Sequence, residues 1–286
     1  MRMSGTAILL LSCPDQKGIV AEIASFIYQY DGNIVHSDQH TDVETNTFFM
    51  RIEWELEGFR IPREKIAQAF SFIADKFSMD WRLVFSDEVP RVAIMVSKFD
   101  HCLYDLLLKW QSKEIKMEIP LIISNHEDLR PVADYYHIPY YCFPVTPETK
   151  TEVEREELKI LREYTIDTVV LARYMQVLST DFIREYPNRI INIHHSFLPA
   201  FVGAKPYHQA YARGVKIIGA TSHYVTEELD NGPIIVQDVI AVSHRDSIHD
   251  MINKGKEVEK RVLSRAVKLH TENKVLVFHN KTVVFD

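Results

Sequence analysis

The hydrophobic pattern of the chain changes at a short polar segment, residues 86 to 90, and this change limits the possible folds most strongly. Before the segment, apolar runs and amphipathic stretches follow the order βαββαβ. After it, buried apolar runs alternate with helical stretches, which is typical of a mainly parallel α/β sheet. With 286 residues the chain is long enough for two ordinary domains. We therefore predict an α/β protein with one domain over residues 1 to 86 and a second over residues 91 to 286.

The first part predicts a small antiparallel sheet with two helices on one face. Strands are expected over residues 7–11, 34–41, 47–55 and 81–85, and helices over residues 19–27 and 62–76. Pro62 fits the first turn of the second helix, where its missing N–H costs no hydrogen bond. Gly18 precedes the first helix, and the N–H groups at such a helix start can hold a carboxylate.

Two short runs of the first part, Cys13–Ala21 and Asp31–Ile34, resemble the beginning of an ACT domain. The resemblance implies a ferredoxin-like fold, pairing into a homodimer or homotetramer, and a small-molecule effector site at the dimer interface. Glycine or methionine is the expected effector. The residues expected to bind it lie in these two runs: Asp15, Gly18, Asn33 and Ile34. An ordinary turn followed by a helix cap would explain the same residues without a ligand.

Asn192 and His194 lie at the end of a strand predicted over residues 190 to 193. Because they are two residues apart, their side chains project to the same side of an extended strand. A primary amide can donate a hydrogen bond to a developing oxyanion, and an imidazole can move a proton at neutral pH. Ligands of open α/β sheets bind outside the carboxyl ends of the strands, which favours a site here. Taken alone, the pair would also suit a strand end that satisfies only local hydrogen bonds.

A second segment, Gly219–Ile235, predicts two strands joined by a loop that contains Asp230. The loop could bring a carboxylate beside the imidazole of His194, orienting it and stabilising its charged form. His195 and His223 could lie close enough to tune such a site. The alternative is an acidic hairpin loop with a turn-forming Asn-Gly-Pro sequence.

Together these segments resemble the folate-dependent formyltransferase family, through Asn-Ile-His at 192–194, Ser-x-Leu-Pro at 196–199 and Asp-x-Gly-Pro-Ile at 230–234. The resemblance covers essentially all of residues 91 to 286. It implies a Rossmann-like domain in which Asn192, His194 and Asp230 are catalytic and 10-formyltetrahydrofolate is the substrate. The run Leu171–Ser179 resembles the segment that lines the pterin pocket in this family. The residues expected to contact the substrate there are Met175, Gln176, Val177 and Leu178.

Residues 97 to 103 indicate which molecule accepts the formyl group. In the purine-synthesis members of the family, a Gly-rich loop at this place cradles the phosphate of an acceptor ribonucleotide. This chain has Ser-Lys-Phe-Asp-His-Cys-Leu, without glycine and with an acidic side chain. It is similar here to the family members that carry an amino-terminal ACT domain and use water as the acceptor. We expect Asp100, His101 and His223 to contact the substrate, although Asp100 and His101 would also suit a helix cap.

The expected reaction is the hydrolysis of 10-formyltetrahydrofolate to formate and tetrahydrofolate, which would supply formate for purine synthesis and balance one-carbon pools. Formyl transfer to an amine is the first alternative. The second is a folate or amino-acid sensor without turnover, against which the complete set of Asn192, His194 and Asp230 speaks.

The composition argues against several other classes of protein. No run approaches 18 uninterrupted apolar residues, and the start lacks the features of a secretory signal, so we expect a cytoplasmic protein without a membrane partner. The net charge is −7 and basic residues form no dense cluster, which disfavours nucleic acid. Three scattered cysteines and the spacing of the histidines predict neither a disulfide framework nor a metal site, and we expect no bound prosthetic group.

Overall fold

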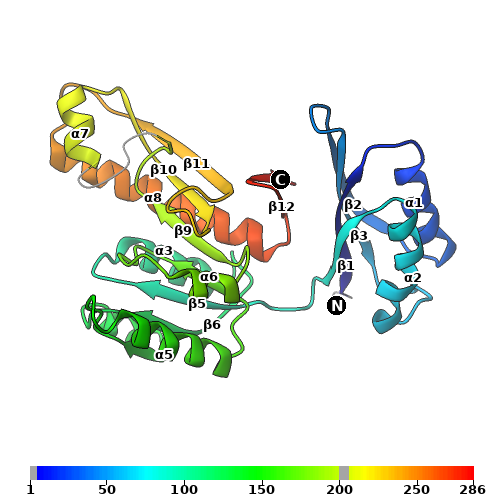
Figure 1. The fold of residues 1–286 in the computed structure, drawn as a ribbon, viewed down its shortest axis with the longest axis horizontal. Helices are drawn as coiled ribbons and strands as arrows, with labels where there is room; N and C mark the ends of the chain where they lie inside the picture. The colour runs from blue at the N-terminus through cyan, green and yellow to red at the C-terminus, as the bar shows by residue number, and fades with distance from the viewer. Residues whose placement is uncertain (1–4, 200–205) are drawn as a thin grey trace. The chain divides into compact units, whose positions relative to one another are not determined.

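The computed structural model describes residues 5–199 and 206–286, and its contacts divide the chain into two units. The first unit comprises the residues up to Val89 together with Glu272–Leu276 and Val283–Asp286. The second comprises Pro90–Thr271 and Val277–Thr282. The end of the chain, which the sequence analysis assigns wholly to the second domain, is therefore divided between the units. The predicted mixed α/β class is confirmed (Figure 1).

The first unit has the predicted βαββαβ order. Its elements are β1 (Thr6–Pro14), α1 (Ile19–Gln29), β2 (Ile34–Asp42), β3 (Thr47–Glu55), α2 (Arg63–Lys76) and β4 (Asp80–Phe85). The strands form an antiparallel sheet in the order β2-β3-β1-β4. Alternate residues of β1, such as Leu9 and Leu11, share a core with Ile23 of α1 and Phe70 of α2. Both helices cover the same face of the sheet (Figure 1).

The second unit is built on a seven-stranded sheet in the order β11-β10-β9-β8-β5-β6-β7. The elements are β5 (Arg91–Val96), α3 (His101–Gln111), β6 (Glu118–Ser124), α4 (Arg130–Tyr135), β7 (Tyr140–Cys142), α5 (Lys150–Glu163), β8 (Thr168–Leu171), α6 (Thr180–Glu185), β9 (Ile190–His194), α7 (Pro206–Arg213), β10 (Ile217–Tyr224), β11 (Ile234–Ala241) and α8 (Ile248–Thr271). Strands β5 to β9 run parallel, whereas β10 pairs antiparallel with both of its neighbours. A short hairpin of β12 (Val275–Phe278) and β13 (Lys281–Val284) ends the chain.

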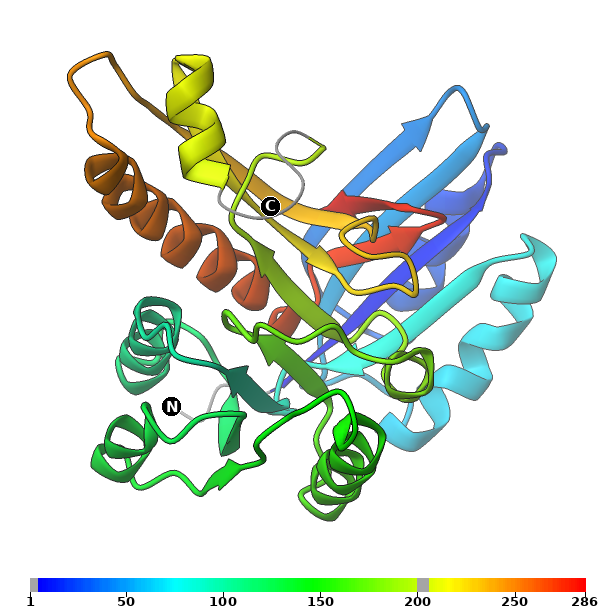
Figure 2. The ribbon, with the colours of Figure 1, turned by 60° about the vertical axis from the view of Figure 1, so that its left-hand side comes forward.

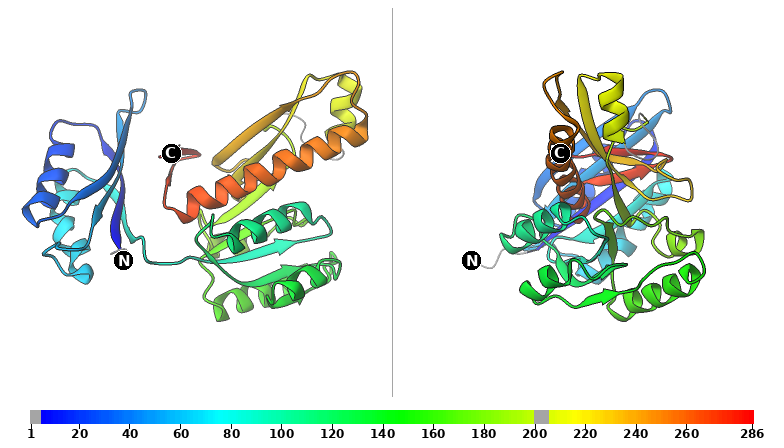
Figure 3. Two further views of the ribbon diagram at one scale, coloured as in Figure 1. Left: turned by 180° about the vertical axis from the view of Figure 1, so that it is seen from behind. Right: turned by 90° about the vertical axis from the view of Figure 1, so that its left-hand side faces the viewer.

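Helices cover both faces of this sheet, which explains why its central strands are continuous apolar runs. Helices α3 and α8 lie on one face, and α5 and α6 lie on the other (Figure 2). The 24-residue α8 runs along β10 and β11 (Figure 3) and is absent from the elements expected from the sequence. It is held by buried residues three or four positions apart, among them Val258, Val262 and Ala266.

The strand order puts a topological switch point at the carboxyl ends of β5 and β8. The chain runs outward from β5 to β6 and β7, and then crosses back to place β8 on the other side of β5. Ligands of open α/β sheets bind at such a switch point because the connections leave it in opposite directions. His194 is the last residue of the next strand, β9, and so lies at the same edge.

Among residues 5–199 and 206–286, no helix combines the length and the apolar character that a membrane span requires.

Candidate active site

A cavity of about 300 Å³ lies at the carboxyl ends of β8 and β9. Three segments form most of its wall: the loop that follows β8, the end of β9, and the loop between β10 and β11. The polar and charged side chains in this wall are Arg173, Tyr174, Gln176, Asn192, His194, His195, His223, Thr226, Glu227 and Asp230. The structure therefore brings the three predicted catalytic residues into one cavity.

The pairing of β9 with β10 places Asn192 opposite His223. The Nδ1 atom of His223 lies 2.9 Å from the carbonyl oxygen of Tyr224, and this nitrogen therefore carries a proton. In the neutral ring, Nε2 accepts a hydrogen bond from the Asn192 amide at 3.3 Å. His223 thus orients the Asn192 amide, and the second N–H of that amide is left for a ligand.

Asp230 reaches His194 from the loop between β10 and β11. Its Oδ2 atom lies 3.2 Å from Nδ1 of His194, and its Oδ1 atom lies 3.7 Å from Nε2 of His223. The hydrogen bond from His194 and, to a lesser extent, the nearby ring of His223 hold the pKa of the Asp230 carboxyl well below its usual range, so the group is a carboxylate. It accepts a hydrogen bond from the Nδ1–H group of His194, so the lone pair of that ring is on Nε2.

The Nε2 atom of His194 is buried and has no hydrogen-bond partner within the described part of the chain. Unpaired polar atoms in protein interiors are rare, and they often have a catalytic role. Here the ring lines the cavity, and its other nitrogen is fixed by a carboxylate. This is the arrangement of a general base with an orienting acid.

The loop that carries Asp230 depends on a glycine. A Cβ atom at Gly232 would lie 1.8 Å from the carbonyl oxygen of Tyr224, so no larger residue allows the loop to close against the end of β10. Tyr224 donates its backbone N–H to the carbonyl of Pro233 across this contact. Gly232 is therefore a steric requirement for the position of Asp230.

The segment that follows His194 is tied to β10 by the hydroxyl of Thr221. This hydroxyl donates to the carbonyl of Ser196 at 2.9 Å and accepts the N–H of Leu198 at 3.0 Å and an amide N–H of Gln237 at 2.9 Å. Thr221 is also the residue opposite His194 in the pairing of β9 with β10. The chain is thus held on both sides of the catalytic imidazole.

The residues predicted to hold the pterin ring, Met175, Gln176, Val177 and Leu178, all line the same cavity. Met175 is 53% exposed and Val177 is 55% exposed, so neither is a core residue, whereas Leu178 is buried in the core of the unit. The loop is fixed by Ser97, whose hydroxyl accepts the N–H of Met175 at 3.0 Å and donates to Asn125 at 2.6 Å.

A buried acid beneath this loop couples stability to pH. The hydroxyl of Tyr174 donates to the carboxyl of Glu157 at 3.0 Å. Burial raises the pKa of Glu157 from 4.5 to about 7, and the nearby Glu154 adds to the effect of burial while the Tyr174 hydrogen bond opposes it. Between these two values the folded chain keeps a proton that the unfolded chain has lost, so the free energy of unfolding falls as the pH rises.

We expect Glu157→Gln to stabilise the protein at pH 8 by up to about 3 kcal/mol and to have little effect at pH 5. Thermal unfolding of both forms at the two pH values measures this difference. Glu156→Gln, at an exposed position on the same helix, is the matched control. A variant that is equally stabilised at pH 5 and pH 8 would contradict the assignment.

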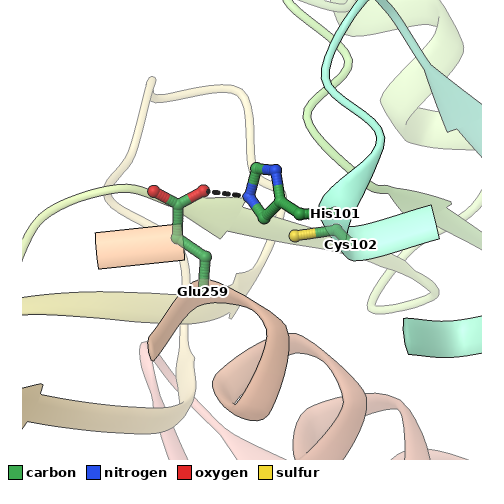
Figure 4. A group of neighbouring side chains, drawn as sticks. All are labelled: His101, Cys102 and Glu259. Atoms are coloured by element: carbon green, nitrogen blue, oxygen red, sulfur yellow. Dashed lines mark hydrogen bonds and ion pairs between the residues drawn. The ribbon is translucent and has the colours of Figure 1, made fainter. Parts of the chain in front are cut away.

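Asp100 and His101, which were expected to contact the substrate, are not part of the cavity wall. Asp100 is exposed at the start of α3 and makes no side-chain cap hydrogen bond there. His101 is turned toward α8, where its Nε2 atom lies 2.8 Å from Oε2 of Glu259 (Figure 4). The third residue of this expectation, His223, does line the cavity.

His101, Cys102 and Glu259 form a cluster whose ligand atoms lie within 4.8 Å of one another, a donor set that can hold a metal ion (Figure 4). Burial raises the pKa of the Cys102 thiol well above its usual value, whereas metal ligands are thiolates. Arg173 already places a positive charge 3.5 Å from the same Glu259 oxygen. These contacts favour a polar cluster, and the prediction of no metal site stays a prediction.

The four residues predicted to bind an effector lie at two opposite ends of the sheet in the first unit. Gly18 has a φ of 99° and, with Asp15, follows the end of β1 that pairs with Thr47. Ile34 begins β2 opposite Trp54, at the other end of β3. Strands of this length separate the two groups by roughly 25 Å. A site that uses all four residues would therefore need a second chain.

The sequence analysis does not single out Arg173 or Glu259. Arg173 is inside the segment that was compared with the pterin pocket, but nothing in that segment marks it as buried. Glu259 is a buried charge near the middle of α8. Buried Glu residues are rare unless they are paired, and the partners of Glu259 are far away in the sequence.

Comparisons with known proteins agree with this fold and show the family. The family model "Formyl transferase" matches residues 90–267, and the model "ACT domain" matches residues 7–74. The chain therefore belongs to the formyl transferase family, joined to an ACT domain. The formyltetrahydrofolate deformylase of Synechocystis sp. is 57% identical over 98% of both chains, and that of Bacillus subtilis is 50% identical over 97% of this chain and 93% of its own. A formyltetrahydrofolate deformylase structure from Pseudomonas syringae pv. tomato matches with a TM-score of 0.97 and 50% identity, covering 100% of this chain and 96% of that one. Within the family, the chain belongs with the formyltetrahydrofolate deformylases.

Proposed function

We propose that the chain hydrolyses 10-formyltetrahydrofolate to formate and tetrahydrofolate, with Asn192, His194 and Asp230 as the catalytic residues. The observation that carries the proposal is the 3.2 Å approach of Asp230 to Nδ1 of His194, in a cavity that Asn192 also lines. Relatives with 57% and 50% identity bear the name of this activity. The match extends over nearly the whole chain, including the ACT domain.

In the proposed reaction, water attacks the formyl carbon while Nε2 of His194 removes one of its protons. The carbonyl oxygen gains negative charge and is stabilised by the N–H of Asn192 that His223 leaves available. The imidazole becomes positively charged, and the carboxylate of Asp230 stabilises it. The bond between the formyl carbon and N10 then breaks as His194 passes its proton to N10. Formic acid loses its remaining proton to solvent and leaves as formate.

The other cavity residues position the substrate in this proposal. Met175, Gln176, Val177 and Leu178 form the wall that would hold the pterin ring, with two exposed apolar side chains that a ligand could cover. Covering Met175 and Val177 would remove apolar surface from water and so favour binding. The hydrogen bond from Met175 to Ser97 would keep the loop in one conformation.

Water as the acceptor is supported by the segment from Ser97 to Leu103. It contains no glycine, and its exposed Asp100 would repel a phosphate. His101 of this segment is bonded to Glu259 and is not directed into the cavity. These features disfavour a ribonucleotide acceptor.

The decisive experiment is an assay with 10-formyltetrahydrofolate and no amine. We expect formate and tetrahydrofolate to appear in equal amounts, and an added amine to leave the rate unchanged. Tetrahydrofolate that forms only when an amine is present would instead indicate a transferase. Folate binding without any turnover would indicate a sensor.

The ACT domain is proposed to bind glycine or methionine through Asp15, Gly18, Asn33 and Ile34 in a homodimer or homotetramer. The separation of these residues within one chain is compatible with a site shared between two chains. In the cell, the reaction would supply formate for purine synthesis and balance one-carbon pools in the cytoplasm. Each amino acid titrated into the formate assay tests the effector, and an unchanged rate with both would reject it.

A further inference from the structure

We propose that Arg173 makes the enzyme specific for water: its buried guanidinium, held by Glu259, keeps protonated amines out of the cavity and leaves neutral water unhindered. The inference rests on the proposed function, because it concerns the acceptor of the same formyl group. Arg173 would be a specificity-determining residue, and Glu259 would be the residue that positions it.

The backbone and the burial of Arg173 are both unusual. Its φ is 65°, in the left-handed region that favours glycine and strains other residues. Its side chain is only 10% exposed, yet it lines the cavity. Charged side chains are almost never buried without a partner. Strained, buried residues of this kind cluster at functional sites.

Glu259 of α8 is the partner of this cation. One carboxylate oxygen, Oε2, lies 3.5 Å from Nε of Arg173 and 2.8 Å from Nε2 of His101, while Oε1 accepts the hydroxyl of Tyr207 at 2.8 Å. Burial alone would raise the pKa of Glu259, but the His101 hydrogen bond and the charge of Arg173 outweigh it and lower the pKa. The group is therefore a carboxylate, and Figure 4 shows His101 directed at it.

The segment from Ser97 to Leu103 supports this cation from a second side. The guanidinium carbon of Arg173 lies 5.0 Å from the centre of the Phe99 ring, within the range of a cation–π contact. His101 of the same segment holds Glu259. Phe99 and His101 both belong to the segment in which the glycines of an acceptor site are missing. These two side chains thus keep Arg173 in place.

The charge of Arg173 is the one permanent positive charge among the described residues of the cavity wall. Burial, and then the charges of Arg173 and His194, lower the pKa of the neighbouring His195 to about 4, so that ring is neutral at pH 7. Of the two carboxylates in the wall, Glu227 pairs with Arg184, and the two oxygens of Asp230 face the rings of His194 and His223. Glu259, the partner of Arg173, is not among the described residues that line the cavity, so an approaching ammonium meets the positive end of this pair where the dielectric constant is low.

This repulsion discriminates because the two acceptors differ in charge. A simple amine is mainly protonated at neutral pH, whereas water is neutral. In the competing transfer reaction the ammonium first loses one proton to solvent, and its nitrogen then bonds to the formyl carbon. The bond from that carbon to N10 breaks, and one of the two remaining amine protons moves to N10. The products would be an N-alkylformamide and tetrahydrofolate in place of formate and tetrahydrofolate.

The test measures both products in one reaction of the full chain with 10-formyltetrahydrofolate and methylamine. Arg173→Gly is expected to raise the ratio of N-methylformamide to formate by about tenfold or more, whereas Arg173→Lys, which keeps the charge, should stay near the wild-type ratio. Glycine adopts a φ of 65° without strain, so this variant should fold. The double variant Arg173→Gly/Glu259→Gln removes both buried charges and should show the same rise.

Hydroxylamine, which is neutral at pH 7, separates charge from space. In Arg173→Gly, the ratio of formylated amine to formate should rise clearly less with hydroxylamine than with methylamine. An equal rise with both would overturn exclusion by charge. An unchanged ratio, or a parallel loss of both products, would leave Arg173 a purely structural role and overturn the inference. Formate release by the wild-type chain without an amine tests the proposed function separately, since its absence rejects that function whatever the ratios are.

Discussion

Replacing Asp230 with asparagine is expected to lower kcat for formate release by roughly 10³-fold, with little change in the KM for the folate. The carboxylate accepts a hydrogen bond from Nδ1–H of His194, with a distance of 3.2 Å between Nδ1 and Oδ2, and so keeps the lone pair of the ring on Nε2. An asparagine amide can donate to Nδ1, which would place the proton on Nε2 and remove the general base. The volume of the side chain is nearly unchanged, so the fold should be retained.

Steady-state formate release by the purified variant measures this effect. Asp238→Asn is the matched control, because Asp238 lies on the neighbouring β11 and pairs with Arg261 at the surface. The control should keep nearly wild-type turnover. If Asp230→Asn retains more than about a tenth of wild-type kcat, the orienting role of Asp230 is wrong.

Replacing His194 with alanine is expected to lower kcat by roughly 10³- to 10⁴-fold, because the imidazole both takes the proton from water and returns it to N10. The double variant His194→Ala/Asp230→Asn should be no slower than His194→Ala alone, since Asp230 acts only through the imidazole. Added imidazole should restore part of the activity of the single variant by filling the space that the ring left.

The matched control is His208→Ala, at an exposed position on α7. Thermal unfolding of all variants distinguishes a loss of catalysis from a loss of fold. Losses that add up in the double variant would show that Asp230 has a role of its own. A His194→Ala variant with near wild-type kcat would remove His194 from the mechanism.

The local pattern of the sequence was sufficient for the parts of the site that one strand or one loop provides. Asn192 and His194 share a side because a strand repeats every two residues, and this holds in any sheet that contains the strand. The four residues from Met175 to Leu178 likewise occupy one loop, and all of them line the cavity. The order of most strands and helices followed from hydrophobic periodicity in the same way, although α6, α7, α8 and the hairpin of β12 and β13 were missed.

Contacts between elements that are far apart in the sequence could not be predicted from the local pattern. His101 and Glu259 are 158 residues apart, whereas Asp100 next to His101 makes no side-chain cap hydrogen bond at the start of α3. The two parts of the proposed effector site were grouped because both resemble segments of an ACT domain, but strand pairing puts them at opposite ends of one sheet. Pairing register depends on the whole sheet and on its packed face, not on the residues of one turn.

The sequence by itself determined the two-part α/β architecture, the family and the three residues proposed for catalysis, because these depend on short-range spacing and on linked motifs. Only the tertiary structure decided which residues surround that chemistry. It directed His101 away from the cavity and toward Glu259 of α8, and it buried Arg173 in the cavity wall next to that carboxylate. The physical reason is that burial and charge pairing arise when elements pack, and the cost of an unpaired buried charge is what selects such partners.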